Sequence, residues 1–429
     1  LEVRSIYTHW DTRHLVNNAI YIKAVWEIFR WSGDLAFLRK TLLTLRRAMR
    51  FMMVEGHGEA LNHIRCSWPG HDGRPGYTVD ANGEKTWHVG HGKGGNYWDL
   101  LPFGWDDMYT TTHYYGALLA MARIEELVAE HPDWAMPEEQ VPFDASSLRD
   151  HAAAVREAVN AKFWNDVPGR FVGCIDADGV ARDYGFTFVN LEAIYYGVAH
   201  PERAQLIMDW LNGRRTVEGD TSTGKDIYHH RLAPRSTTRR NVDWYGFFWT
   251  HPERLPFGGQ VQDGGAVLGF SFYDIMSRIR VLGADNAWER LMAIRAWDEE
   301  VTGYGGYRTY YEDGKGTTTL QGGGTAGGIG IDFEFTESSM LPAVIPLGFM
   351  GLQPDGDTLQ VRPNLPAACP EMSIRNLVYQ GTRMDIRVSA EQVTLWIKQS
   401  PPRALCVAFW SHTRSLREPG VYTLPGNAP

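Results

Sequence analysis

Apolar residues recur at helical spacing in pairs of segments that are joined by short turns. The first pair spans residues 13–31 and 35–54, with Ser32, Gly33 and Asp34 between them. Apolar positions three and four residues apart form one face of a helix. A short connection makes two such helices antiparallel neighbours. We therefore expect a helical hairpin at the start of the chain.

The same unit of helix, short turn, helix and long loop recurs further along the chain. About nine helices are recognisable from their apolar spacing. After the first pair they span residues 107–130, 145–163, 186–199, 201–211, 264–281, 284–299 and 338–350. Packing such hairpins side by side and closing the array gives an (α/α)6 toroid, with the long loops at one rim. Six hairpins make twelve helices, so either some escape the pattern or the first lie upstream of Leu1. An open superhelix is the alternative.

Beyond Gly351 the apolar positions alternate instead. The segments DTLQVRP, MSIRNLVYQG, TRMDIRVSA and QVTLWIK place apolar residues at every second position between turn signals. This period is typical of an antiparallel sheet. We therefore predict a mostly α protein with an α/α-barrel catalytic domain over residues 1–351, to which an upstream part can belong. A C-terminal β-sandwich-like segment is expected over residues 352–429.

Composition narrows the function classes. The chain has 429 residues, of which 43% are hydrophobic and 22% charged, as in ordinary globular proteins. Its net charge of −9 and pI near 5.9 argue against a nucleic-acid partner. The four cysteines show no metal-binding spacing, and the longest apolar run, residues 340–352, is too short for a transmembrane segment. The sequence leaves a cytoplasmic and a secreted or periplasmic location equally open.

The stretch Gly94–Thr112, GGNYWDLLPFGWDDMYTTT, combines three aspartates with five aromatic side chains. Sugar rings stack their C–H faces on aromatic side chains. A carboxyl group in an apolar wall has its pKa raised, so that it can donate a proton near neutral pH. Acids among aromatics therefore favour a sugar-cleaving site. A turn whose aspartates only cap the following helix is the alternative.

Two segments resemble the (α/α)6-barrel glycoside hydrolases, or six-hairpin glycosidases, the group that includes trehalase and the processing α-glucosidases. Gly95–Asp107, followed by MYTTTHYYGALLAMA, resembles the acid-bearing loop before a barrel helix. Ile331–Gly351 resembles the late loop and helix that bear the second carboxylate, and PDGDTLQVRPNLP after it resembles the attached β-rich segment. The resemblance implies hydrolysis of an oligosaccharide, polysaccharide or glycoconjugate by two carboxylates, without metal or organic cofactor.

Inverting hydrolysis needs a carboxylic acid to protonate the leaving oxygen and a carboxylate, about 6.5–9.5 Å away, to activate water. The two groups must therefore come from separate loops. We predict Asp99 as the acid, with Asp107 as a rival that a helix-capping role explains as well. We predict Glu337 as the base, in the first turn of the last barrel helix, where the helix dipole favours the ionised form. Glu334 is its rival, and a helix-stabilising acid is the alternative role.

Two further acids and several rings are candidates for substrate contact. Asp263, flanked by glycines that allow close approach of a ligand and expected at a helix start, is a sugar-binding acid, an alternative catalytic acid or a cap. Glu192 lies on an apolar helix face, where a carboxylate needs either a ligand or an ion pair. The loop side chains that we predict to stack on or bind a sugar, with core packing an equal alternative for each ring, are Trp98, Trp105, Trp244, Tyr245, Tyr304 and His91.

Three other functions remain open from the sequence. A polysaccharide lyase on the same fold would need cations in its cleft, for which Lys93, Arg235 and Arg239 are available. A phosphorylase would depend on phosphate, and a non-catalytic glycan-binding protein would retain only the binding surface. The histidines lack HxH and HExxH spacing, and Gly322–Gly330 is not a dinucleotide fingerprint, so we predict no metal or cofactor. The oligomeric state is not encoded in these patterns.

Overall fold

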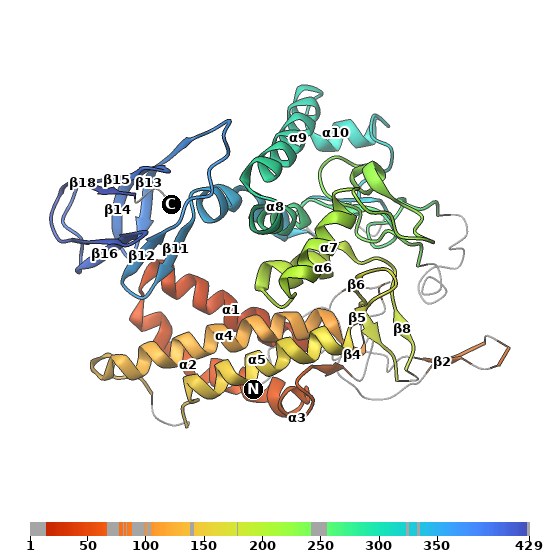
Figure 1. Cartoon of the computed structure of the whole chain (residues 1–429), viewed down its shortest axis with the longest axis horizontal. Helices are drawn as coiled ribbons and strands as arrows, with labels where there is room; N and C mark the ends of the chain where they lie inside the picture. The colour runs from red at the N-terminus through yellow and green to blue at the C-terminus, as the bar shows by residue number, and fades with distance from the viewer. Residues whose placement is uncertain are drawn as a thin grey trace.

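Helices dominate the chain up to residue 349 and strands follow from Leu352 onward (Figure 1). The computed structural model describes residues 14–66, 77–79, 81–82, 84–87, 98, 101, 104–137, 141–177, 179–241, 255–322, 326–332 and 335–426. The helical elements are α1 (Leu15–Ser32), α2 (Leu35–Val54), α3 (Gly58–Leu61), α4 (Met108–Glu130), η1 (Pro132–Trp134), α5 (Ala145–Lys162), α6 (Thr187–Tyr196), α7 (Pro201–Leu211), η2 (Gly224–Tyr228), α8 (Phe270–Val281), α9 (Ala284–Gly303), α10 (Tyr307–Glu312), η5 (Thr336–Ala343) and η6 (Val344–Phe349).

The short turns of the hairpins follow from capping residues. Gly33 ends α1 with φ of 62°, a left-handed conformation that glycine adopts without a Cβ penalty, and its amide donates to the carbonyl oxygen of Phe29 at 2.7 Å. Asp34 then caps α2, because its carboxylate accepts from the amide of Phe37 at 3.0 Å. At the next hairpin turn, Pro201 occupies the first position of α7, where its missing N–H costs no helical hydrogen bond.

The hairpins form a ring with an inner and an outer layer. Within the described residues, the inner elements α1, α4, α6, α8 and η5–η6 line a common central cavity, and α2, α5, α7 and α9 contribute no lining residue. Each outer helix packs on the inner helix that precedes it. The inner helices also contact one another in chain order, α1 on α4, α4 on α6, α6 on α8, and α8 on η5–η6. The predicted toroid of hairpins is confirmed by this arrangement.

The long loops all enter the ring at the same rim. Each tight turn joins the C-terminus of an inner helix to the next outer helix, so each long loop leads into the N-terminus of an inner element. Between α2 and α6, short strands tie these loops together in a sheet of order β1-β4-β7-β8. They are β1 (Arg65–Cys66), β4 (Trp105–Asp107), β7 (Cys174–Ile175) and β8 (Ala181–Arg182). The rim at the N-termini of the inner helices is therefore where loop side chains gather.

The remaining short strands belong to small ladders around the toroid. Two of these ladders are antiparallel pairs, β2 with β3 and β5 with β6, and the third is the parallel pair of β9 with β10. The strands of these ladders are β2 (Tyr77–Val79), β3 (Lys85–Trp87), β5 (Trp164–Asn165), β6 (Arg170–Phe171), β9 (Ala266–Val267) and β10 (Ile329–Gly330).

The C-terminal part is a lobe of two four-stranded sheets, drawn in blue in Figure 1. Their orders are β11-β12-β16-β17 and β13-β14-β15-β18. In β14, buried apolar residues alternate with less buried ones, as expected for a sheet with one face in a core. The strands are β11 (Leu352–Asp355), β12 (Thr358–Val361), β13 (Glu371–Tyr379), β14 (Thr382–Ser389), β15 (Gln392–Ile397), β16 (Leu405–Phe409), β17 (His412–Leu416) and β18 (Gly420–Pro425).

The structure differs from the sequence-based expectations in three places. The helix expected from Gly264 begins only at Phe270, because the glycine-rich segment before it forms loop and the short strand β9. The last inner helix is not a regular α-helix but a 3-10 segment followed by a π segment, and Pro342 lies inside it. The C-terminal sheets are not wholly antiparallel, since β12 and β16 pair in parallel. No helix in the described residues is both long and apolar enough to cross a membrane.

Candidate functional site

The start of α4 is built on two adjacent buried aspartates with different environments. Asp106 contacts three basic side chains, His63 Nε2 at 2.9 Å, Arg65 Nε at 2.8 Å and Lys162 Nζ at 2.9 Å. Although burial opposes it, this set of partners holds the pKa of Asp106 well below its usual range. Asp106 is therefore an ionised anchor that ties β4 to β1 and to α5.

Asp107 is fully buried and caps α4, with its carboxyl oxygen accepting from the amide of Thr110 at 2.8 Å. Burial raises its pKa to about 7, so that the carboxyl holds a proton into the neutral range. The carboxyl also interacts with the Cys66 thiol, whose own pKa is raised by burial. This is the geometry of the helix cap that the sequence offered as the alternative to a catalytic role for Asp107.

Two of the three tryptophans predicted as stacking platforms lie in the described part of the chain and have different surroundings. Trp98 is 2% exposed and packs against Phe188 and Phe270, with ring centroids 5.1 and 5.7 Å away. Its ring is therefore part of the core at the loop-side rim and is closed to a stacked sugar. Trp105 is half-buried, has a left-handed φ of 55°, and lies 4.8 Å from the guanidinium carbon of Arg65. One face of the Trp105 ring is thus taken by a cation.

Glu337 lies in the first turn of η5, where the sequence placed it. It rests on Gly269, immediately before α8, so closely that a Cβ built there would come within 2.4 Å of the Cγ of Glu337. Glycine is required at this position for the carboxylate-bearing side chain to fit. Because Phe270 follows Gly269 and packs on Trp98, the loop that holds Trp98 and the turn that holds Glu337 meet at the start of α8.

Glu192 belongs to a polar network near the axis of the ring. Its Oε2 lies 2.9 Å from Nε2 of His113. On the other side of the imidazole, Nδ1 is 2.5 Å from Nζ of Lys23, which also donates to the Tyr196 hydroxyl at 2.7 Å. An ammonium group only donates, so Nδ1 of His113 is an acceptor and the ring proton is on Nε2, facing Glu192.

Burial dominates the protonation of this network. Desolvation lowers the pKa of Lys23 to about 7, with Glu192 and Glu27 opposing the shift. The pKa of His113 is also lowered, first by burial and then by the nearby Lys23 charge. The imidazole is therefore neutral, and below about pH 7 it bridges the Lys23 ammonium and the Glu192 carboxylate. Glu192 thus has the buried partner that its position required, but with a neutral imidazole the 2.9 Å contact is not an ion pair. The partner, His113, was not among the predicted residues.

Tyr109 connects the network to the loop-side rim. Its ring lies 4.7 Å from the ring of His113 and 5.9 Å from that of Phe188. Phe188 in turn stacks on Phe270, at 4.7 Å between centroids. An aromatic wall, consisting of Trp98, Tyr109, Phe188 and Phe270, thus links Glu192 to the position of Glu337. The structure brings together Trp98, Glu192 and Glu337 of the predicted residues through this wall.

Asp263 lies outside that group. It is buried in the loop before α8, where its carboxylate accepts from the amide of Asn241 at 2.9 Å and lies 3.6 Å from Nη1 of Arg240. The expectation that Asp263 begins a helix was wrong, because α8 starts only at Phe270. These contacts show a carboxylate that fixes two loop segments to each other.

Tyr304 is 40% exposed at the end of α9. Its hydroxyl donates to Asp313 at 3.2 Å, and the ammonium of Lys315 lies 5.4 Å from its ring centroid. These contacts belong to α9 and α10, not to the start of α8. The other predicted residues lie outside the described part of the chain, and they are Asp99, Glu334, Trp244, Tyr245 and His91.

Among the residues that the structure describes, no group of three or more His, Cys, Asp or Glu side chains is arranged to hold a metal ion. What the described groups offer is a carboxylate on an inner element, a wall of aromatic rings and a neutral histidine held between charges. Such a set suits acid–base chemistry on an uncharged organic ligand.

Comparison with known proteins gives a partial family match and a fold. Residues 352–407 match the sequence family described as glycosyl hydrolase family 65, C-terminal domain. No curated protein sequence matches the chain.

Among solved structures, the chain is similar to a GH78 family rhamnosidase of Bacillus sp. GL1, with a TM-score of 0.50 and 14% identity over 95% of this chain and 34% of that one. It is also similar to a sialidase, with a TM-score of 0.49 and 14% identity over 87% and 30% of the two chains. A third similar structure is an α-L-rhamnosidase from Dictyoglumus thermophilum, with a TM-score of 0.46 and 11% identity over 94% and 39%. The chain spans about a third of the length of these proteins. It has the six-hairpin, (α/α)6 glycosidase-like fold.

Proposed function

We propose that this chain, with its six-hairpin glycosidase-like fold, contains the active site of a carbohydrate-active enzyme that hydrolyses a glycosidic bond with inversion. Asp99 is the general acid and Glu337 the general base. Residues 1–351 form the catalytic domain, and residues 352–429 form an attached β-sandwich-like domain. The match of residues 352–407 to a glycosyl hydrolase domain supports the carbohydrate class of substrate.

The meeting of two carboxylate-bearing segments at the start of α8 carries the proposal. Glu337 packs on Gly269, and Trp98, whose chain neighbour is Asp99, packs on Phe270. The two acids come from separate loops, as a mechanism with opposed carboxylates requires. Trp98 and Glu337 both lie at the rim where the long loops converge, which is the usual place for binding residues on a rigid scaffold.

The proposed roles follow from the chemistry of each position. Glu337 is in the first turn of a helical element, where the partial positive charge of the helix start favours its ionised form. As a base it removes a proton from water, and the oxygen of that water attacks the anomeric carbon. Asp99 gives its proton to the leaving glycosidic oxygen as that bond breaks. The products are a free sugar of inverted configuration and the alcohol of the remaining part.

The described cations argue against a polysaccharide lyase. Arg235 is only 5% exposed and its guanidinium contacts the carboxylate of Asp226 and the carbonyl oxygen of Gly264. Arg239 donates to Asp220 at 2.7 Å. Both guanidiniums already have acidic or carbonyl partners, so neither offers an unpaired charge to a uronate carboxylate.

Sugar release from a panel of glycosides tests the proposal. We expect Asp99→Asn and Glu337→Gln each to lower kcat by at least about a hundredfold, because each removes one acid–base group. Glu418→Gln, at an exposed glutamate in the turn between β17 and β18, is the matched control and should retain wild-type rates. Glu334→Gln should have a smaller effect than Glu337→Gln, and the reverse order would reassign the base.

Phosphate and product absorbance separate the other enzymes from a hydrolase. Hydrolysis should proceed in phosphate-free buffer and give a product without ultraviolet absorbance. A rate that depends on added phosphate would identify a phosphorylase, and an absorbing unsaturated product would identify a lyase. Binding of glycans without any turnover, unchanged in both carboxylate variants, would contradict the proposal and indicate a binding protein.

A further inference from the structure

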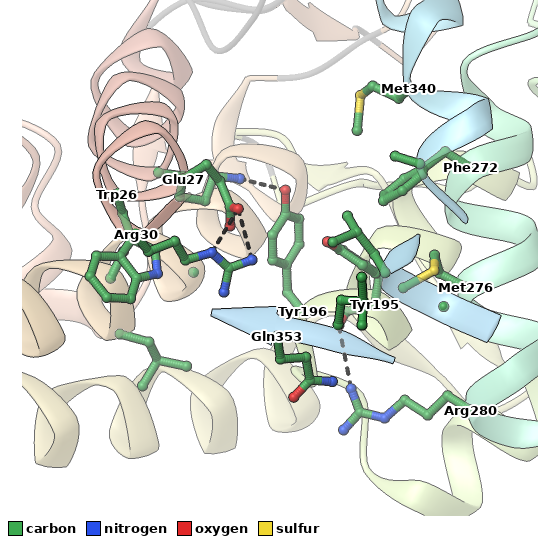
Figure 2. A pocket seen from close by; sticks show the side chains of 18 of the residues that line it. Trp26, Glu27, Arg30, Tyr195, Tyr196, Phe272, Met276, Arg280, Met340 and Gln353 are labelled. Carbon is green, nitrogen blue, oxygen red and sulfur yellow. Dashed lines mark hydrogen bonds and ion pairs between the residues drawn. The ribbon is translucent and has the colours of Figure 1, made fainter. Parts of the chain in front are cut away.

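A cavity of about 990 Å³ lies between the inner helices and β11 (Figure 2). Its lining comes mostly from the C-terminal halves of the inner helices, for example Trp26 on α1, Tyr195 on α6 and Met276 on α8, and from Gln353 on β11. The loop-side rim is at the opposite, N-terminal ends of these helices. The cavity borders the candidate site at Lys23 and Tyr196 of the polar network, and at Met340, three residues after Glu337.

Two of the cations in the cavity wall are paired with acids. Arg30 contacts Glu27 at 2.7 Å, an ion pair visible in Figure 2. Arg123 contacts Asp355 on β11 at 2.7 Å. Because both acids line the same cavity, these pairs add no net charge to the space.

The other two cations are held by helix groups. Lys23 contacts His113, which contacts Glu192, so that the ammonium is linked to a carboxylate through one neutral ring. Arg280 donates to the carbonyl oxygens of Ile194 at 3.0 Å and Tyr195 at 3.3 Å, at the C-terminus of α6. That helix end carries partial negative charge, which offsets the guanidinium. Each cation in the cavity wall therefore already has an acidic, carbonyl or ring-nitrogen partner.

The groups that remain available are neutral. Among the described residues, the side chains of Trp26, Tyr195 and Gln353 have no hydrogen-bond partner, although all three line the cavity. Burial raises the pKa of Tyr195 to about 12, so its hydroxyl stays protonated and can both donate and accept. Gln353 is exposed and adds an amide with donors and an acceptor. Aromatic rings with neutral hydrogen-bonding groups between them are complementary to hydroxyl groups on an apolar ring face.

We propose that this cavity is a second binding site, for a neutral saccharide of more than one ring. Its volume is at the upper end of the roughly 300–1,000 Å³ that ligand pockets span. Trp26 and Tyr195 supply apolar ring surface and one hydroxyl, beside the contacts of Trp26 with Arg30 and of Tyr195 with Phe272 and Tyr273. Gln353 supplies an amide from the β-lobe. The proposal does not depend on catalysis at Asp99 and Glu337, because none of these three residues belongs to that site.

Calorimetric titration of the full chain with neutral disaccharides tests the site. The protein is the double variant Asp99→Asn with Glu337→Gln, so that no sugar is consumed, and the probes are cellobiose, maltose and lactose, with cellobionate as the charged match of cellobiose. We expect saturable binding of at least one neutral disaccharide. Gln353→Trp, which fills the cavity from an exposed strand position, should weaken that binding at least tenfold. Trp26→Leu should weaken it by a similar factor.

The control is Gln392→Trp, at an exposed position of β15, which should leave the affinity unchanged. Binding that is unchanged in both Gln353→Trp and Trp26→Leu would overturn the proposal, as would tighter binding of cellobionate than of cellobiose or no binding of any neutral probe. Glycoside hydrolysis by the wild type is read separately. Absence of disaccharide binding together with normal hydrolysis would overturn only the cavity proposal. Disaccharide binding in the cavity without hydrolysis by the wild type would overturn only the proposed function.

Discussion

Replacing Asp107 with asparagine should change the pH dependence of stability and leave turnover intact. Asparagine is as good a helix cap as aspartate, so the bond from the Thr110 amide is kept. What changes is the titrating carboxyl, whose pKa is raised by burial from 3.8 to about 7. Between these two values the folded state holds a proton that the unfolded state has released.

The sign and size follow from this difference. Because the folded wild type binds more protons in that window, its stability falls as pH rises from about 4 to about 7. Each pKa unit corresponds to about 1.4 kcal/mol, so the full effect is at most about 4 kcal/mol. From pH 5 to pH 7 the free energy of unfolding of the wild type should fall by roughly 2 kcal/mol relative to Asp107→Asn. Above about pH 8, where the carboxyl is ionised in both states, the difference between the two proteins should become constant.

Urea unfolding of both proteins at pH 5, 6, 7 and 8 measures the effect, and all other titrating groups cancel in the comparison. A constant difference between the two proteins across this range would refute the buried, protonated carboxyl. Glycoside hydrolysis by the same variant provides a second readout. A loss of turnover by orders of magnitude in a well-folded Asp107→Asn would refute the capping role and return Asp107 to the catalytic candidates.

Three other substitutions test the packing around the site. Glu125→Gln breaks the buried pair with Arg46, whose two bonds of 2.8 Å join α2 to α4. It should lower the free energy of unfolding, measured in urea, by about 3–5 kcal/mol. The control Glu126→Gln, at a partly exposed pair with Arg149, should lower it by less than about 1 kcal/mol. Gly269→Ala should lower kcat for glycosides at least about tenfold, because the added Cβ clashes with Glu337. The control Gly303→Ala, where a Cβ meets open space, should leave kcat unchanged. An unchanged kcat in Gly269→Ala would contradict the placement of Glu337. Trp98→Ala should destabilise the protein by about 3–5 kcal/mol because its ring is in the core, and an effect on sugar affinity alone would restore the stacking role.

The helical hairpins could be predicted because their signals are local. The bounds predicted for α2 and α7 agree with the structure, since an N-cap such as Asp34 or a first-turn proline such as Pro201 marks each start. These local signals do not predict the 3-10 turns of η5 and the π turns of η6. Pro342 removes a helical hydrogen bond, but whether the chain then breaks or continues with a changed pitch depends on the packing around it.

The site could be predicted only in part because its contacts are distant in sequence. That Glu192 needed a partner was readable from its apolar helix face, yet the choice of His113 depends on how α4 packs against α6. The only signal for His113 was a lone histidine on another apolar helix face. Likewise, a tryptophan such as Trp98 has the same sequence context whether its ring faces a cleft or the core, and the fold places it in the core.

Proton NMR of the sugar released by the wild-type protein, recorded within the first minutes of reaction, tests the central claim most directly. Two opposed carboxylates with water between them predict that the first product has the inverted anomeric configuration, and that Glu337→Gln abolishes its release. A first product of retained configuration would contradict the account, because it would require a covalent intermediate in place of the water that Glu337 activates.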